Sequence, residues 1–235
     1  MTIIVGINIM IIKKFLLKCA DATGITSKIP RTRIDAFLQA HRSDKKTLDI
    51  GSGHGPYDHY FPHRVSVDIE PGQGVDHVAD AHDLLRFDDG SFEVVLATEV
   101  LEHLHTPQQA INEMYRVLKP GGSVILTTRF IFPLHNIPGD YWRFTRYGLE
   151  RLFRDFKHVE VIEETTTLEA IAVLFERLAF QTDTLYLKPL SIGWLVLSKL
   201  TIFFSFIITT EYGEVNRTHR TKGILSSGYY VVAVK

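Results

Sequence analysis

Residues 48–57 read LDIGSGHGPY, an apolar run that leads directly into a loop with the glycines Gly51, Gly53 and Gly55. Glycines let the backbone turn sharply and let a ligand approach the main chain closely. In an open α/β sheet, ligands bind where such loops leave the carboxyl ends of the strands. We therefore expect this loop to bind a ligand, with a purely structural turn as the alternative.

The spacing of the glycines narrows the choice of ligand. The pattern is G-x-G-x-G, and Pro56 stands where the G-x-G-x-x-G turn of dinucleotide-binding proteins has its third glycine. No Gly-Lys-Ser/Thr follows, so the loop is not a phosphate-cradling P-loop either. Dinucleotides and triphosphates are disfavoured, which makes an NAD-dependent oxidoreductase the less favoured alternative.

Short apolar segments alternate with helical patterns along the rest of the chain. The predicted strands lie at residues 47–50, 65–68, 76–79, 92–97, 123–128, 158–162 and 229–234. Before the fifth strand, Thr106, Pro107 and Gln109 predict the start of a helix with a capping box. Another helix is expected to start at Thr145. Alternation of this kind predicts a parallel sheet covered by helices on both faces.

Carboxylates stand at the ends of the first three predicted strands. Asp49 precedes the glycine loop, Asp68 ends the second strand, and Asp80 follows the third. A carboxylate in the position of Asp68 can accept two hydrogen bonds from a ribose diol, and one in the position of Asp80 can accept from an exocyclic amine. The alternative is that Asp49 caps the loop and Asp80 caps the helix after it.

Five stretches follow in order between residues 48 and 128: LDIGSGHG, VDIEP, ADAHDL, FEVVLATEVLEHL and RVLKPGG. In this order and spacing, the chain resembles the class I S-adenosylmethionine-dependent methyltransferases. The resemblance implies a doubly wound α/β fold with a seven-stranded sheet in the order 3-2-1-4-5-7-6. Strand 7 would be antiparallel, and the C-terminal GYYVVAVK is similar to it.

We expect four parts along the chain. They are a helical segment at residues 1–46, a Rossmann-like core that binds S-adenosylmethionine at 47–166, an apolar helical insertion between strands 6 and 7 at 167–227, and the final core strand at 228–235.

The resemblance also implies which residues bind the cofactor. The glycine loop would hold its amino-acid end, with Asp49 beneath the loop or at the methionyl amine. Asp68 would bind the ribose, residues 80–81 the adenine amine edge, and residues 98–99 the methionyl portion. The implied cofactor-binding residues are Asp49, Gly51, Ser52, Gly53, Gly55, Asp68, Ile69, which would pack on the adenine, Asp80, Ala81, Thr98 and Glu99.

The stretch after the fifth strand, RFIFPLHNIPGDYWRFT at residues 129–145, is dense in polar and aromatic side chains. Such loops usually carry chemistry or recognition. A similar H-x-x-P-x-D-Y-W-R-F-T stretch occurs in a branch of the same family. We predict His135 as a general base because the unperturbed pKa of histidine is near neutrality. The alternative is that His135 and Arg143 only tie down the loop through Asp140.

A divalent metal ion is a second possibility for this region. Glu99, Glu102 and His103 fall at i, i+3 and i+4, so one helical turn could present all three, with His135 completing the site. Some methyltransferases that act on hydroxyl groups have similar E-x-x-E-H elements and use a metal, whereas many relatives with EVLEH use none. We expect no metal and keep the site as an alternative. His82 and His105 are expected to be solvated.

Charge and cysteine content exclude several classes of protein. Lys and Arg total 26 and Asp and Glu total 27, a net charge of -1 that gives no basic footprint for nucleic acid. The single cysteine, Cys19, excludes an intrachain disulfide framework and favours a reducing, cytoplasmic compartment. The favoured function is methyl transfer to a small-molecule, glycan or lipid-linked acceptor, and the alternative is a non-catalytic module that only holds the cofactor.

Two apolar stretches raise the question of membrane contact. Thr2–Ile12 is too short to span a bilayer and is expected to pack on the domain. Leu190–Ile208 reaches the lower limit for a span but carries Lys199 at its middle. Because the last strand must return to the same sheet, the chain crosses a membrane an even number of times or not at all.

We therefore expect the insertion to rest on the cytoplasmic face of a membrane without crossing it. A narrow polar stripe recurs every seven residues, at Ser191, Ser198 and Ser205. Trp194 and the phenylalanines at 203, 204 and 206 would face the acyl boundary, as in an interfacial helix. The alternative is a lid over the site or a dimer interface in a soluble protein.

Overall fold

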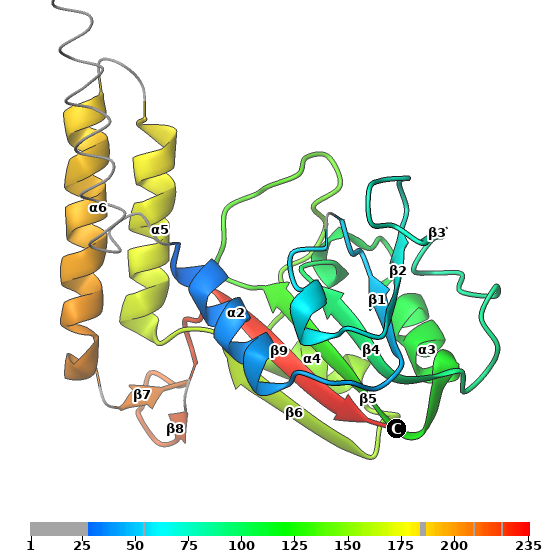
Figure 1. The fold of residues 1–235 in the computed structure, drawn as a ribbon. Coiled ribbons are helices and arrows are strands. Elements are labelled where there is room, and N and C mark those ends of the chain that lie inside the picture. Colours follow the sequence, from blue (N-terminus) through cyan, green and yellow to red (C-terminus); the bar gives the residue numbers. More distant parts are fainter. Residues whose placement is uncertain (1–27, 54, 184–186, 209, 222) are drawn as a thin grey trace, which may run out of the picture.

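The computed structural model describes residues 28–53, 55–183, 187–208, 210–221 and 223–235 (Figure 1). Thr2–Ile12 and Cys19 lie outside these residues, as does the greater part of the predicted N-terminal segment.

One seven-stranded sheet forms the centre of the fold, in the order β3-β2-β1-β4-β5-β9-β6 (Figure 1). The strands are β1 Thr47–Ile50, β2 Arg64–Asp68, β3 His77–Val78, β4 Phe92–Thr98, β5 Leu118–Arg129, β6 His158–Glu163 and β9 Gly228–Val234. The pairings from β3 through to β5 are parallel, while β9 runs antiparallel to both β5 and β6. The predicted strand order is confirmed, with β9 in the place of the predicted strand 7.

Helices cover the sheet on both faces, as the alternating pattern predicts. Strand β4 is buried on both sides, so successive residues point to opposite cores. Val94 and Leu96 pack in the core under α2, Ile29–Ala40. Val95 and Ala97 pack in the core under α3, Pro107–Val117, and α4, Arg146–Leu152.

The helix starts only partly follow the sequence prediction. Thr145 caps α4 as expected, and its hydroxyl accepts from the backbone N–H of Gly148 at 3.1 Å. The capping box predicted at Thr106 is wrong, because Thr106 makes no side-chain cap and the Gln109 amide donates to the carbonyl of His82 at 3.0 Å. A capping box does form at the start of α5, between Thr166 and Glu169.

The insertion is a pair of helices that stands beside the sheet (Figure 1). It consists of α5, Thr167–Gln181, and α6, Lys188–Phe203, followed by a 3₁₀ turn at Ser205–Ile207. A small hairpin of β7, Glu211–Tyr212, and β8, Arg220–Thr221, then leads back to β9. The helices agree with the sequence prediction, whereas the hairpin is an addition to it.

The polar stripe of α6 faces α5 instead of water. Ser191 and Ser198 are buried, and the Ser191 hydroxyl donates to the carbonyl of Ala179 at 2.9 Å. Trp194 stacks on Phe175 of α5, with ring centroids 5.8 Å apart. The expectation that Trp194 faces lipid is therefore wrong, because serines and the indole form the seam between the two helices.

The base of the insertion is fixed to the sheet by buried hydrogen bonds. The Thr165 hydroxyl lies 2.9 Å from that of Ser227, and the Thr165 N–H donates to the Ser226 hydroxyl at 3.2 Å. Ser227 also donates to Glu164. The chain thus leaves and re-enters the sheet at one place, which holds α5 beside the carboxyl ends of the central strands.

Candidate functional site

The glycine loop has a backbone that only glycine adopts easily. Gly51, Gly53 and Gly55 have φ angles of 69°, 52° and 62°. A side chain at Gly51 would lie 2.2 Å from a methyl of Val100, so this glycine allows close packing beneath the loop. At Gly53 nothing lies within 4 Å of the position of a Cβ, so the loop presents open space on that side.

The surroundings of this open space suit a nucleoside with an amino-acid tail. Asp68 is partly exposed at the end of β2, and its Oδ2 accepts from the N–H of Gly53 at 2.9 Å. The Ser52 hydroxyl is buried without a hydrogen-bond partner among the described residues. Beside Asp68, the apolar side chain of Ile69 is 68% exposed. A carboxylate, an unsatisfied hydroxyl and an apolar surface together fit S-adenosylmethionine.

Asp49 lies beneath the loop and takes part in a buried ion pair. Arg64 donates to Asp49 at 3.2 Å and also contacts Asp58 at 2.8 Å, so one guanidinium braces both sides of the loop. Burial raises the pKa of Asp49 from 3.8 to about 7, although Arg64 acts in the opposite direction. This arrangement agrees with the expectation that Asp49 orders the loop.

The region after β3 forms a closed turn. Asp80 accepts from the backbone N–H of His82 at 2.9 Å and contacts its Nδ1 at 2.5 Å, next to the buried Ala81. Burial raises the pKa of Asp80, but these hydrogen bonds outweigh it and the net pKa is lowered. The expectation that Asp80 caps a following helix is wrong, because turns follow it.

The prediction that His82 is solvated is also wrong. His82 is buried, stacks on the exposed His105 with ring centroids 4.1 Å apart, and accepts from the Thr106 N–H at 3.2 Å through Nε2. Asp80, His82 and His105 lie close enough to hold a metal ion. Since both ring nitrogens of His82 are already in hydrogen bonds, His82 has no free lone pair for a metal ion, and we interpret this cluster as a structural turn.

The end of β4 carries Thr98 and then Glu99, whose φ is 58°. The Glu99 carboxylate contacts Arg129 at the end of β5 and accepts from the Thr127 hydroxyl at 2.9 Å. Arg129 in turn donates to both oxygens of the buried Glu164, at 3.0 and 2.9 Å. Burial raises the pKa of Glu99 to about 8, with Arg129 opposing the shift.

His135 projects from the loop after β5. Its backbone N–H donates to Asp140 at 2.8 Å, and Asp140 is held by two hydrogen bonds from Arg143 at 2.6 and 2.7 Å. These bonds keep the pKa of Asp140 well below its usual range. Burial lowers the pKa of His135 below 6.5, although Asp140 opposes this. Asp140 and Arg143 tie down the loop, and the Nδ1 of the His135 ring also lies 3.3 Å from Asp140.

Glu102, His103 and His135 meet at one point. Their potential ligand atoms all lie within 4.8 Å of one another. One oxygen of the fully buried Glu102 accepts from the Thr128 hydroxyl at 2.8 Å, and the other has no hydrogen-bond partner among the described residues. This unsatisfied oxygen and the imidazoles fit a divalent cation. Glu99 is not part of the cluster, because residues 101–103 form a 3₁₀ turn and Arg129 engages Glu99.

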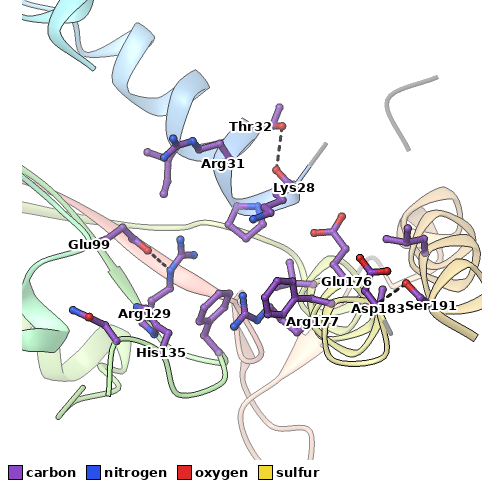
Figure 2. Close-up of a pocket in the computed structure, with 18 of the residues that line it drawn as sticks. Lys28, Arg31, Thr32, Glu99, Arg129, His135, Glu176, Arg177, Asp183 and Ser191 are labelled. Atoms are coloured by element: carbon purple, nitrogen blue, oxygen red, sulfur yellow. Dashed lines mark hydrogen bonds and ion pairs between the residues drawn. The ribbon is translucent and has the colours of Figure 1, made fainter. Parts of the chain in front are cut away.

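A pocket of about 930 Å³ connects this centre to the insertion. Figure 2 shows Glu99, Arg129 and His135 at one end, and Asp183 and Ser191 of the helical pair at the other. The N-terminal turn of α2 and α5 form the walls between them. Of the sequence-predicted site residues, Glu99 and His135 line this pocket, and the others lie along the carboxyl edge of the sheet.

Three charged residues of the site were missed from the sequence: Arg64, Arg129 and Glu164. Arg64 could have been found from strand register, because it lies on β2 on the same face as the residue paired with Asp49. Arg129 could have been found from its position at the end of β5. Glu164 has no comparable signal, since its burial depends on the return of the chain at Ser227.

The brace beneath the loop gives a test by substitution. We expect Arg64→Gln to lower the free energy of unfolding by roughly 3 kcal/mol at alkaline pH, because Asp49 remains buried without its cation. Loss of Arg64 raises the folded-state pKa of Asp49 above the wild-type value of about 7, while the unfolded value stays near 3.8. The variant therefore continues to lose stability above pH 7, where the wild type no longer does.

Urea denaturation at about pH 6 and about pH 8.5 measures this difference. The gap between wild type and Arg64→Gln should widen at the higher pH, and Asp49→Asn in addition should abolish the widening. A gap that is the same at both pH values would contradict a charged, buried Asp49.

Comparison with known proteins agrees with this geometry. Residues 48–126 match the methyltransferase domain family. A ubiquinone biosynthesis O-methyltransferase of Pseudomonas aeruginosa is 32% identical over 108 residues, which cover 38% of this chain and 47% of that protein. The match thus spans less than half the length of this curated relative.

Solved structures share the fold at low sequence identity. An S-adenosylmethionine-dependent methyltransferase of Thermotoga maritima superposes with a TM-score of 0.54 at 15% identity, covering 88% of this chain and 91% of that one. Phosphoethanolamine N-methyltransferase 2 of Haemonchus contortus, solved with S-adenosyl-L-methionine, has a TM-score of 0.52 at 17% identity and covers 87% of this chain and 52% of that one.

Together, these matches and the strand order identify the fold as that of the class I S-adenosylmethionine-dependent methyltransferases, with a methyltransferase domain at residues 48–126, and they support S-adenosylmethionine as the cofactor.

Proposed function

We propose that this protein is an S-adenosylmethionine-dependent methyltransferase of the branch with the H-x-x-P-x-D-Y-W-R-F-T loop. The observation that carries the proposal is the pocket in which Glu99, at the end of β4, and His135, on the loop, lie at the same end. A module that only held the cofactor would have no need of a pocket that extends from Glu99 as far as the helical pair.

The cofactor contacts that we propose are those implied by the resemblance, and the geometry of the glycine loop supports them. Gly51, Ser52, Gly53 and Gly55 hold the amino-acid end of S-adenosylmethionine, and Asp49 orders the loop from below. Asp68 binds the ribose hydroxyls and Ile69 packs on the adenine. The remaining contacts are Asp80 and Ala81 at the adenine amine, and Thr98 and Glu99 at the methionyl portion.

S-adenosylmethionine, when bound, supplies an electrophilic methyl group on a sulfonium. If the acceptor starts protonated, its proton would have to leave when the methyl group is transferred. Burial lowers the pKa of His135 and so favours the neutral imidazole, whose Nε2 can take this proton. The resulting imidazolium lies between Asp140, at 3.3 Å from Nδ1, and Glu102, at 3.9 Å from Nε2. Asp140, whose pKa is lowered, stabilises this charge as a carboxylate.

The acceptor that we propose is a small molecule, a glycan or a lipid-linked compound. The net charge of -1 argues against nucleic acid. The alternative for the same centre is a divalent cation on Glu102, His103 and His135, favoured by the unsatisfied oxygen of Glu102. Such an ion would orient a hydroxyl of the acceptor and lower its pKa.

The cofactor assignment is tested by binding. We expect Asp68→Ala to weaken binding of S-adenosylhomocysteine about tenfold or more, because the ribose diol loses a charged acceptor. Glu70→Ala, which removes an exposed carboxylate two residues away, should bind like the wild type. Isothermal titration calorimetry gives both affinities. Equal affinity for wild type and Asp68→Ala would contradict the ribose contact, and tight NADH binding would contradict the proposed cofactor.

The catalytic assignment is tested by turnover. We expect His135→Ala to slow methyl transfer about a hundredfold or more while cofactor affinity is retained, because a general base is lost. Labelled methyl transfer into cell extract, sorted into lipid, polysaccharide, protein and small-molecule pools, measures turnover and locates the acceptor. His158→Ala, an exposed histidine at the start of β6, is the matched control.

The same assay separates the base from the metal. If a cation is required, excess chelator stops turnover, added Mg²⁺ or Mn²⁺ restores it, and Glu102→Gln has the same effect as the chelator. Full activity in excess chelator would leave His135 as base, and an active His135→Ala enzyme would contradict both roles.

We also propose that α6 rests on the cytoplasmic face of a membrane. By length and composition, Lys188–Ile207 could cross a bilayer, and only 11% of its apolar window is buried in the protein. Its serines face α5, so the outward face is apolar, which is the reverse of a helix in water. The exposed apolar residues of this face are Leu190, Ile192, Val196, Leu197, Leu200, Phe203, Phe204, Phe206, Ile207 and Ile208.

Contact with the membrane surface fits better than a span. Helix α5 is joined to the core by Glu169, which pairs with Arg33, and by Glu176, which accepts from the Ile29 N–H at 3.2 Å. Both strands that flank the insertion, β6 and β9, belong to the same sheet. A single crossing by α6 would place them on opposite sides of the bilayer, so α6 lies along the interface.

Vesicle flotation tests this placement. We expect the protein to float with phospholipid vesicles, and the triple variant Phe203→Ser, Phe206→Ser, Ile207→Ser to bind at least about tenfold more weakly, since each buried side chain contributes about 1.5–3 kcal/mol. The matched control replaces Val78, Leu85 and Tyr147, which are exposed apolar residues outside the insertion, by Ser. If the wild-type protein does not float with the vesicles, membrane contact is contradicted. The helical pair would then be a lid over the site or a dimer interface.

A further inference from the structure

Arg177 of α5 is an arginine held in place without an acidic partner. Its guanidinium carbon lies 5.1 Å from the ring centroid of Phe132 and 5.5 Å from that of Phe180. Its Nε is buried and has no hydrogen-bond partner, and no carboxylate of the described residues forms an ion pair with it. Buried donors are normally satisfied, so this group calls for an explanation.

The carboxylates that line the same pocket are already engaged. Glu99 pairs with Arg129, and Asp183 pairs with Lys188. Glu176, which precedes Arg177 on α5, lies 3.6 Å from Lys199 and accepts from the N–H of Ile29. Each of these acids thus has a cationic partner other than Arg177.

Basic residues on the opposite wall add to this positive charge. Arg31 and Lys28 belong to the N-terminal turn of α2 and line the same pocket (Figure 2). Arg31 donates at 3.3 Å to the hydroxyl of Tyr57, a neutral group. The part of the pocket between α2 and α5 is thus electropositive, although the chain as a whole has a net charge of -1.

We propose that Arg177 binds an anionic group, a phosphate or a carboxylate, of the methyl acceptor. This inference rests on the proposed methyltransferase function and names the substrate class. A planar guanidinium stacked on aromatic rings is pre-organised, so it loses little freedom when it binds an oxyanion through two hydrogen bonds. The aromatic rings leave the edge of the guanidinium as the polar surface presented to a ligand.

The position of Arg177 fits an acceptor that reaches the reacting centre. The ring of Phe132 contacts both Arg177 and Arg129. The guanidinium carbon of Arg129 lies 4.6 Å from the centroid of this ring. An anion on Arg177 would therefore be separated from Glu99 and Arg129 by about one aromatic ring. The acceptor would place its anionic group at Arg177 and its reacting atom near His135.

The helical-pair end of the pocket carries the apolar side chains of Val173, Phe180 and Leu195. Its polar groups are already engaged, because Asp183 pairs with Lys188 and the Ser191 hydroxyl donates to a backbone carbonyl. An acceptor that joins an anionic group to an apolar group therefore matches both parts of the pocket. An anionic lipid headgroup and a soluble organic phosphate share this chemistry, so the probes must separate the two sources.

Calorimetry on the full-length protein saturated with S-adenosylhomocysteine tests the subsite. The probes are hexyl phosphate and, as its uncharged match, hexanol. We expect Arg177→Gln to weaken hexyl phosphate binding about tenfold or more, because a charge-assisted contact is lost. The affinity of Arg177→Lys for hexyl phosphate should lie between those of the wild type and Arg177→Gln. Arg151→Gln, which neutralises an exposed arginine on α4, should bind like the wild type.

Retained affinity for S-adenosylhomocysteine in Arg177→Gln establishes that the variant is folded. Equal hexyl phosphate binding by wild type and Arg177→Gln, or hexanol binding as tight as that of hexyl phosphate, would overturn the proposal. The protein could instead bind hexyl phosphate through Arg177 and fail to bind S-adenosylhomocysteine. That result would contradict the methyltransferase function but would support an anion-binding site at Arg177.

A second set of probes identifies the source of the anion. Phosphatidylcholine vesicles with and without phosphatidic acid are compared with inorganic phosphate in solution. Tighter binding to the phosphatidic acid vesicles that depends on Arg177 supports a lipid acceptor, and binding of phosphate alone that depends on Arg177 supports a soluble one. Binding of both probes without dependence on Arg177 would overturn the proposal.

Discussion

The ion pairs of Arg129 hold the functional parts of this protein together. This one buried side chain contacts Glu99 at the end of β4 and both oxygens of Glu164, which directly follows β6. Tyr230 of the antiparallel strand β9 donates to the same Glu164 at 3.2 Å. The ends of four strands therefore meet at a single guanidinium. A hydrophobic cluster could fill the same space, but only a directional group fixes the relative positions of these strand ends.

This arrangement also determines the charge at the reacting end of the pocket. Glu99, Glu102 and Glu164 surround Arg129, so the acids outnumber the base. Burial raises the pKa of Glu99 to about 8 and raises that of Glu102 as well. Unpaired negative charge is energetically unfavourable in a buried site of low dielectric constant. A proton shared among these carboxylates reduces that charge. A cation near Glu102 would serve the same purpose, and so would the imidazolium that the proposed mechanism forms at His135.

The sequence predicts the core well because its signals are local. The glycine loop, the strand alternation and the capping at Thr145 each depend on residues close together in the chain, and the fold confirms them. The Thr106 capping box was wrong because a tertiary contact engages Gln109 with His82. The ligand-atom cluster keeps Glu102, His103 and His135 but not Glu99, because the predicted helical turn is a 3₁₀ turn and the partner of Glu99 comes from β5. The roles of the predicted cofactor residues and of His135 stay predictions.

The helical pair shows why periodicity alone cannot orient a helix. The serine stripe of α6 was interpreted as the polar side of an interfacial helix, but a stripe of small residues equally suits close packing against another helix. Small side chains let α5 and α6 approach, and Ser191 satisfies its hydroxyl on a carbonyl of α5. The apolar face must then point outward. The same packing places Arg177, on the adjoining turn of α5, towards Phe132 and the pocket instead of towards solvent. The helical pair thus presents the apolar face of α6 on the outside and Arg177 of α5 on the wall of the pocket. An acceptor with an apolar part and an anionic part would use both.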